Sequence, residues 1–217
     1  MTSGFKRLTL ATLAAGSLAA ALSACAPLVV GGVVVGSALV VSDRRTSGAQ
    51  LEDEGIELRS ANRIKDTVGD KAHVNVTSYN RQVLLTGEVP TAKDREQIEA
   101  AVRNVDNVRG VVNELAVMPN SSLTQRSNDT LITGKVKASF VDAKDISLNA
   151  FKVVTERNTV YLLGIVTPRE ANRVTEIARG VGGVEKVVRV FEIVSEEELA
   201  RSQPKPAPVT ADPAAKN

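Results

Sequence analysis

The sequence predicts an α+β protein with two tandem domains, each a three-stranded mixed sheet packed on two helices in the order αββαβ. Two observations carry this prediction. The chain matches itself when it is shifted by 76 or 77 residues, which indicates a duplicated structural unit. In addition, the hydrophobic period changes between extended and helical at the same places in both copies.

The central strands give the closest match between the copies. Val83–Val89 lies over Val160–Val166 at a spacing of 77 residues, and both segments have a valine at each end and a glycine at the fifth position. The preceding segments alternate apolar and polar residues, which is typical of a strand buried on one face. The alternating apolar residues are Val74 and Val76 in the first copy and Phe151 and Val153 in the second. Short turns at residues 80–81 and 157–158 predict two antiparallel hairpins.

The segment after each hairpin has the i, i+3, i+4, i+7 pattern of an amphipathic helix. The apolar residues are Ile98, Ala101, Val102 and Val105, and at a spacing of 76 they lie over Val174, Ile177, Ala178 and Val181. A β-branched run then predicts a third strand, at 108–115 and 184–191. Because the chain returns through a helix, this strand is expected to pair in parallel through a right-handed crossover.

Glycines mark two further features. Gly87 and Gly164 lie inside predicted strands and indicate a bulge or a close backbone approach. The glycines of segment 180–183 follow a helix and lack the lysine of a phosphate-binding loop, so they favour a helix C-cap.

The first 24 residues are typical of a secretion signal, with Lys6 and Arg7 before an apolar Leu/Ala run. The following Leu22-Ser23-Ala24-Cys25 resembles a bacterial lipobox, which implies acylation of Cys25 as the new N-terminus; the alternative is a free thiol. The residue after the cysteine is Ala26. An aspartate at this position would resemble the signal that retains lipoproteins in the inner membrane. In a bacterium with two membranes, this resemblance favours the periplasmic face of the outer membrane.

A second apolar run, 26–41, is shorter than the roughly 20 residues of a membrane span. Its glycines and valines make it a poor helix in water. We therefore predict a tether over 25–49 that lies against the membrane, with a transmembrane helix as the alternative. The proline-rich C-terminal segment, 195–217, predicts a disordered tail.

Composition excludes several classes of function. The chain has 27 basic side chains, two of them in the predicted signal, against 25 acidic ones. The sequence therefore lacks the overall excess of positive charge that is typical of nucleic-acid-binding proteins. Aromatic residues make up 3%, and the only histidine is His73. We find no catalytic constellation, no metal site and no cofactor motif, and an isolated His73 is expected to be exposed or hydrogen-bonded. The sequence therefore predicts a protein that is not an enzyme.

In each copy, a valine-rich strand that contains a glycine is followed by an amphipathic helix and then by a strand with the pattern V-x-x-V-V. This order resembles the BON domain, a small module of the bacterial envelope. Residues 43–46 (DRRT) and 127–133 (SNDTLIT) carry the resemblance further, and the doubling behind a lipobox is similar to dual-BON outer-membrane lipoproteins. We expect BON domains at 50–118 and 127–194, joined by a linker at 119–126. The turn residues Asn80-Arg81 and Arg157-Asn158 depart from the Asn-Gly common in the family.

The helix at 129–141, which Asn128 or Asp129 is expected to cap, has a core stripe of Ile132, Val136 and Phe140. A different face is apolar and smooth, with a cation at its border, which suits the boundary between lipid headgroups and acyl chains. The candidate phospholipid-binding residues on it are Leu131, Gly134, Lys135, Ala138 and Val141. From these residues alone, binding of lipid and packing against the other domain are equal alternatives for this face.

The BON resemblance implies binding of anionic phospholipid, such as phosphatidylglycerol or cardiolipin, by the second domain and a role in outer-membrane integrity. Family members often carry Trp at the position of Leu131, which implies weaker binding here. The alternative function is a periplasmic adaptor that recruits a protein partner in envelope assembly or division.

Overall fold

A computed structural model describes residues 43–202 of the chain. The predicted signal peptide, Cys25, the run 26–41 and the segment 203–217 of the predicted tail lie outside the described residues. The described residues belong to one compact unit, which contains both predicted domains. Among the residues the structure describes, we find no helix with the length and apolar character needed to cross a membrane.

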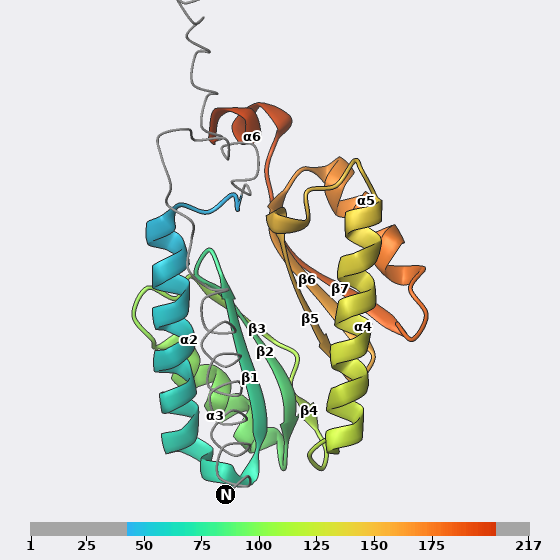
Figure 1. Cartoon of the computed structure of the whole chain (residues 1–217). Coiled ribbons are helices and arrows are strands. Elements are labelled where there is room, and N and C mark those ends of the chain that lie inside the picture. The colour runs from blue at the N-terminus through green and yellow to red at the C-terminus, as the bar shows by residue number, and fades with distance from the viewer. Residues whose placement is uncertain (1–42, 203–217) are drawn as a thin grey trace, which may run out of the picture. The chain divides into compact units, whose positions relative to one another are not determined.

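The first domain contains two helices and a sheet (Figure 1). Its elements are α2 (Ser47–Val68), the 3₁₀ turn η2 (Gly69–Lys71), β1 (His73–Tyr79), β2 (Gln82–Val89), α3 (Ala92–Arg103), β3 (Gly110–Asn113) and β4 (Ala116–Val117). Strand β1 pairs antiparallel with β2, and both β3 and β4 pair parallel with β2. This confirms the predicted mixed sheet and its crossover through a helix.

The second domain repeats this order. Its elements are α4 (Leu123–Asp142), the 3₁₀ turn η3 (Leu148–Ala150), β5 (Phe151–Glu156), β6 (Thr159–Val166), α5 (Pro168–Arg179), β7 (Lys186–Ile193) and α6 (Glu196–Ser202). Strand β5 pairs antiparallel with β6, and β7 pairs parallel with β6. Helix α5 ends at Arg179 with Gly180 as its C-cap, which confirms the prediction for this segment.

One difference between the domains is that the third strand of the first is interrupted between β3 and β4, whereas β7 is continuous. The side chain of Asn113 makes two hydrogen bonds at this interruption. Its Oδ1 accepts from the backbone N of Leu115 at 3.2 Å, and its Nδ2 donates to Glu99 on α3 at 2.9 Å. The chain then rejoins β2 as β4 in an unchanged register, because Asn113 pairs with Leu85 and Ala116 pairs with Glu88.

Both hairpins close through turn residues with positive φ, at Asn80, Arg81, Arg157 and Asn158. Non-glycine residues adopt this conformation at a cost, so the turns need external support. A buried aspartate supplies it in each domain. Asp53 of α2 accepts from the backbone N of Asn80 (2.8 Å) and Arg81 (2.7 Å), and Asp129 of α4 accepts from Arg157 and Asn158 (both 2.9 Å).

Gly87 and Gly164 occupy equivalent places where two strands come close together. A Cβ on Gly87, which has φ 115°, would collide with the backbone carbonyl of His73. A Cβ on Gly164 would lie 2.6 Å from the carbonyl O of Ala150. The prediction of a close backbone approach is therefore confirmed at both positions.

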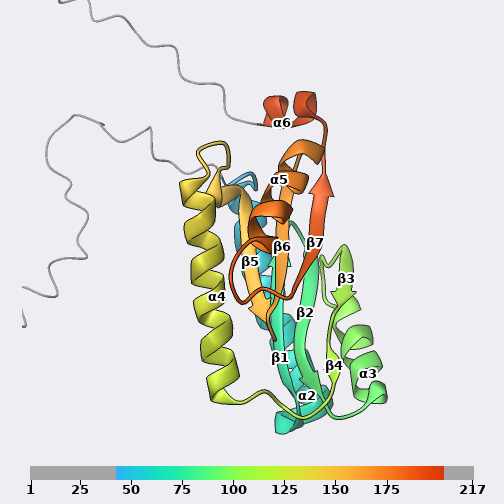
Figure 2. The same cartoon turned by 90° about the vertical axis from the view of Figure 1, so that its right-hand side faces the viewer.

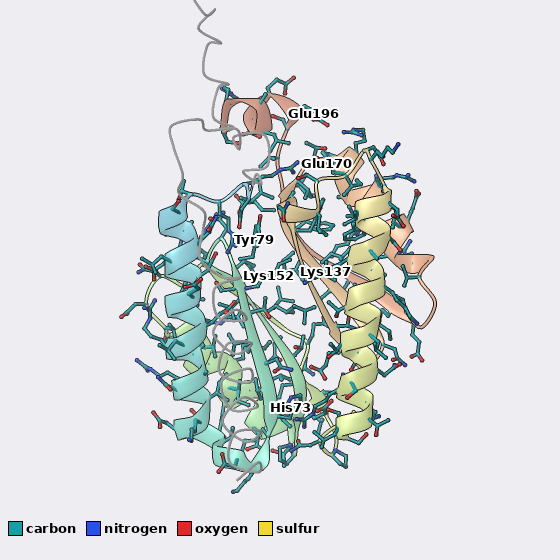
Figure 3. The ribbon with its side chains drawn as sticks, in the orientation of Figure 1. His73, Tyr79, Lys137, Lys152, Glu170 and Glu196 are labelled. Carbon is teal, nitrogen blue, oxygen red and sulfur yellow. The ribbon has the colours of Figure 1, made fainter. Side chains whose placement is uncertain are left out.

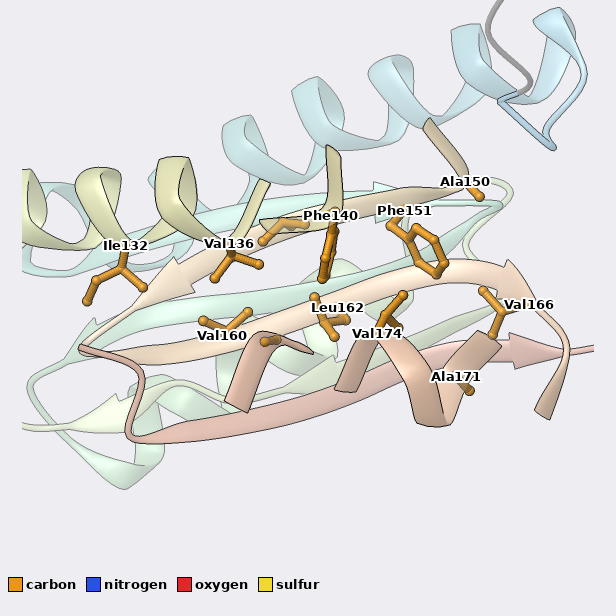
Figure 4. Packing of buried hydrophobic residues seen from close by; sticks show 12 residues of the cluster. Ile132, Val136, Phe140, Ala150, Phe151, Val160, Leu162, Val166, Ala171 and Val174 are labelled. Atoms are coloured by element: carbon orange, nitrogen blue, oxygen red, sulfur yellow. The ribbon is translucent and has the colours of Figure 1, made fainter. Parts of the chain in front are cut away.

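The helices cover one face of each sheet and enclose its hydrophobic core (Figures 1 and 2). Figure 4 shows the core of the second domain, in which Phe140, Leu162 and Val174 meet between α4, β6 and α5. A third cluster includes Leu84 of the first sheet and Leu163 of the second. The faces opposite the helices thus pack on each other, which explains why β2 and β6 are buried along nearly their whole length on both sides.

Three segments are more helical than predicted. Helix α2 begins at Ser47, inside the predicted tether 25–49, because Thr46 caps it by accepting from the backbone N of Ala49 at 3.1 Å. Helix α4 begins at Leu123, inside the predicted linker, because Ser122 and Gln125 form a capping box with backbone-to-side-chain distances of 2.8 and 3.2 Å. The prediction that Asn128 or Asp129 caps this helix is therefore wrong. Residues 196–202 form α6 with Leu199 buried, so the predicted disorder from residue 195 is wrong for this part of the tail.

Candidate functional site

The candidate site is the exposed face of α4. Its opposite face is fixed by Ile132, Val136 and Phe140, which are at most 1% exposed and belong to the core of the second domain. At about 100° per residue, this buried stripe requires the residues on the far side of the helix to face solvent. The sequence therefore sets both faces of α4 through one periodic pattern.

The structure places all five predicted site residues on this exposed face. Leu131 is 64% exposed and Val141 is 63% exposed, although both are large and apolar. Between them, a Cβ added at Gly134 would meet no atom within 4 Å, so the surface is open there. Lys135 and Ala138 are also exposed. The arrangement is an apolar strip with a small-residue centre and a cation beside it.

Two residues of the same face were not predicted. Leu123, in the first turn of α4, is 79% exposed and lies about 80° around the helix from Leu131. Lys137, labelled in Figure 3, is exposed on the border opposite Lys135. We define the α4 face as Leu123, Leu131, Gly134, Ala138 and Val141, with Lys135 and Lys137 at its borders. The Ser122-x-x-Gln125 capping signal was the feature of the sequence that would have revealed Leu123.

The segment before α2 holds both domains. Arg44 donates to both carboxylate oxygens of Glu170, at 2.6 and 2.8 Å, and to the carbonyl O of Ile165 at 2.7 Å. Arg45 donates to Asp53 at 2.6 Å and lies 4.3 Å from the ring centre of Tyr79. The C-terminal end of the predicted tether therefore contacts the second domain through Arg44 and the first domain through Arg45, rather than lying against the membrane there.

Two carboxylates in this region have a lowered pKa. Burial alone would raise the pKa of Glu170, but the hydrogen bonds from Arg44 outweigh it and lower the pKa below its ordinary value. Burial opposes a similar lowering at Asp53, where hydrogen bonds from Ser78, Arg81 and Arg45 prevail. Both groups are therefore charged at neutral pH and act as fixed acceptors.

A polar cluster lies where β1 and β2 meet the end of β5. Nδ1 of His73 lies 3.0 Å from Oε2 of Glu88, and Nδ2 of Asn75 donates to Oε2 of Glu156 at 2.8 Å. Glu88 and Glu156 are 0% and 3% exposed. Burial raises the pKa of Glu156, the hydrogen bond from Asn75 opposes this, and the nearby charge of Glu88 raises it further. Sequence reasoning missed this cluster.

The comparisons with known proteins agree with this architecture. The BON domain profile matches residues 52–119 and 128–195. The outer membrane lipoprotein DolP of Haemophilus influenzae is 39% identical over 173 residues, which are 78% of this chain and 89% of that protein. A 21 kDa hemolysin of Actinobacillus pleuropneumoniae is 34% identical over 154 residues, 70% of this chain and 79% of that protein.

Among solved structures, CdsD, a structural protein of the type III secretion system of Chlamydia trachomatis, matches 65% of this chain and 95% of its own at 11% identity. Its TM-score of 0.27 is too low to support an argument about fold or function.

Proposed function

The chain belongs to the BON domain family, with two such domains, and is similar to an outer membrane lipoprotein, and we propose that it is a lipid-anchored protein on the periplasmic face of the outer membrane. In this proposal the chain is anchored through Cys25, which lies outside the described residues. It binds anionic phospholipid, such as phosphatidylglycerol or cardiolipin, through the α4 face of the second domain and supports envelope integrity without catalysing a reaction.

The observation that carries the proposal is the exposure of large aliphatic side chains on one helix face. Leu123, Leu131 and Val141 are all more than 60% exposed, although burial of each would be favourable. Moving one such side chain out of water is worth roughly 1.5–3 kcal/mol, so the face gains free energy when it enters the acyl region. The exposed lysines at its borders each add about 1 kcal/mol near anionic lipid.

Leu131→Glu is expected to reduce binding to anionic vesicles by more than tenfold. The variant loses the burial of one leucine and adds repulsion from the headgroups, and about 1.4 kcal/mol already gives a factor of ten. The measurement is co-sedimentation of residues 43–202 with phosphatidylglycerol and phosphatidylcholine vesicles. This fragment keeps both cores and the contacts of Arg44 and Arg45, and it lacks the anchor that would bind any bilayer.

The chain offers a matched control for this experiment. Leu58 on α2 is 66% exposed, against 64% for Leu131, and each lies on the long first helix of its domain. Leu58→Glu is expected to bind vesicles as the wild type does. If both variants bind equally well, the α4 face is not the site. If the wild-type fragment ignores both kinds of vesicle, the periplasmic adaptor is the better function.

Lys135→Ala is expected to weaken binding less than Leu131→Glu, by about fivefold, because one surface lysine contributes about 1 kcal/mol. The remaining binding is also expected to depend less on salt, since part of the screened attraction is gone. Vesicle titrations at low and physiological ionic strength measure both effects. Lys93→Ala, which changes an exposed lysine on α3, serves as the control and should match the wild type.

A further inference from the structure

The polar cluster between the domains contains three side chains with metal-ligating atoms. His73 and Glu88 come from the first domain and Glu156 from the second, and one ligand atom of each lies within 4.8 Å of the other two. His73, labelled in Figure 3, begins β1, while Glu88 lies near the end of β2. The register of the first sheet pairs His73 with Glu88, so the sheet itself fixes two of the three groups.

One oxygen of the cluster has no hydrogen-bond donor. Glu88 is fully buried, and its Oε1 accepts no hydrogen bond, whereas its Oε2 accepts from the backbone N of Ser121 at 3.1 Å. The nearest cation to Oε1 is Arg157, whose Nε lies 3.6 Å away and also lacks a partner. A buried carboxylate oxygen without a donor is costly, so this atom has free capacity for a ligand.

The internal repeat shows that domain contact does not require these residue types. At a spacing of 77, His73, Glu88 and Glu156 correspond to Ala150, Ile165 and Tyr79. The second trio also meets across the domains, because Tyr79 Oη donates to the carbonyl O of Ala150 at 3.3 Å. One side of the interface is thus closed by Tyr, Ala and Ile, whereas the other side has Glu, His and Glu at the same positions.

We infer that His73, Glu88 and Glu156 form a binding site for one divalent transition-metal ion, best matched by Zn²⁺, that joins the two domains. An imidazole nitrogen with two carboxylates suits Zn²⁺, whereas Mg²⁺ and Ca²⁺ prefer sites made of oxygen alone. The ion would also balance the negative charge that two buried glutamates bring together. This site is independent of the α4 face and of lipid binding.

The surroundings allow the ion to enter and to complete its coordination. A cavity of about 390 Å³ borders the cluster, with His73, Asn75, Asp129 and Glu156 among its lining residues. Water in this cavity can occupy the fourth position of a tetrahedral site. Zinc bonds of about 2.0–2.2 Å hold ligand atoms less than roughly 4 Å apart, so the three side chains need to close by about an ångström.

Other charged groups around the cluster are already engaged. Both carboxylate oxygens of Asp129 accept backbone N–H groups of the hairpin turn. Arg126, at the cavity wall, donates to the side chain and carbonyl of Ser121, both at 3.2 Å. Arg157 is therefore the one described cation that faces Glu88 directly, and it does so without a hydrogen bond.

Calorimetric titration with ZnCl₂ tests the site on the full chain, purified without an affinity tag in detergent micelles and stripped with a chelator. We expect one Zn²⁺ per chain and a higher unfolding midpoint when zinc is present, because a ligand of the folded state stabilises it. Glu156→Gln and His73→Gln should each weaken zinc binding at least tenfold. Glu176→Gln, an exposed glutamate on α5, should bind as the wild type does, and Mg²⁺ should not replace zinc.

Glu156→Gln keeps an acceptor for Asn75 and removes the repulsion from Glu88, so it is expected to fold. His73→Gln provides a second variant on the other domain, and His73 is the only histidine of the chain. The inference is overturned if the wild type binds no zinc, or if zinc binding is unchanged in both variants. If the wild type binds no zinc and metal-free Glu156→Gln has a higher unfolding midpoint than the wild type, a proton shared between the carboxyl groups of Glu88 and Glu156 explains the cluster instead.

Discussion

Val174→Asp is expected to unfold the second domain, the largest effect of any single change considered for this protein. Val174 is 0% exposed and lies in the core with Phe140 and Leu162. The variant loses the burial of one aliphatic side chain and places a carboxylate where no partner can reach it. Together these effects are expected to cost about 4 kcal/mol or more, a large part of the 5–15 kcal/mol that stabilises a typical domain.

A circular dichroism melt measures this effect. The matched control is Asn172→Asp, which introduces the same residue on the exposed side of the same helix and should leave the midpoint nearly unchanged. Ile98→Asp, at the repeat-equivalent position and also 0% exposed, should destabilise the first domain by a similar amount. Melts of Val174→Asp and Ile98→Asp that match the wild type would contradict the described cores.

Asp53→Ala is expected to cost about 3–5 kcal/mol, because it breaks a buried ion pair and leaves buried donors without acceptors. Asp53 is 1% exposed and accepts hydrogen bonds from Arg45 (2.6 Å), Ser78 (2.6 Å), Asn80 (2.8 Å) and Arg81 (2.7 Å). Without it, the positive-φ turn of the first hairpin loses its support. Asp129→Ala removes only the two turn hydrogen bonds and should cost less.

Urea unfolding of both variants checks this order, and Asp53→Asn separates charge from hydrogen bonding because it keeps one acceptor. The wild type should also show the pH dependence of a carboxylate with a lowered pKa. The contribution of Asp53 is fully present above its unfolded pKa of about 3.9 and is lost as the pH falls through its lower folded pKa. An Asp53→Ala protein as stable as the wild type at pH 7 would contradict this role.

Repetition made much of the fold predictable from the sequence. The apolar quartet around Val174 and the alternation at Val153 recur in the other copy, so hairpins, second helices and crossovers were correct. The start of α4 was predicted wrongly, because Asp129 satisfies the sequence rule for a helix N-cap as well as Ser122 does. In the structure the carboxylate of Asp129 accepts hydrogen bonds from the hairpin turn, and Ser122 caps the helix about two turns earlier.

The α4 face was predictable because one helical period decides which residues are buried and which are exposed. The cluster of His73, Glu88 and Glu156 was not, because it depends on how two domains dock. Glu88 and Glu156 are far apart in the sequence, and neither stands in a local motif. Such a site emerges only from tertiary packing, which periodicity within one element does not encode.

Tryptophan fluorescence at position 131 measures whether the α4 face inserts into anionic lipid. The chain has no tryptophan, so Leu131→Trp and Leu58→Trp each create a single reporter on an exposed helix face. With phosphatidylglycerol vesicles, the emission of Leu131→Trp is expected to shift to shorter wavelength, as an indole leaves water for the membrane interface. The emission of Leu58→Trp should stay unchanged. A shift in Leu58→Trp without one in Leu131→Trp, or no shift in either, would show that the α4 face does not insert into the lipid.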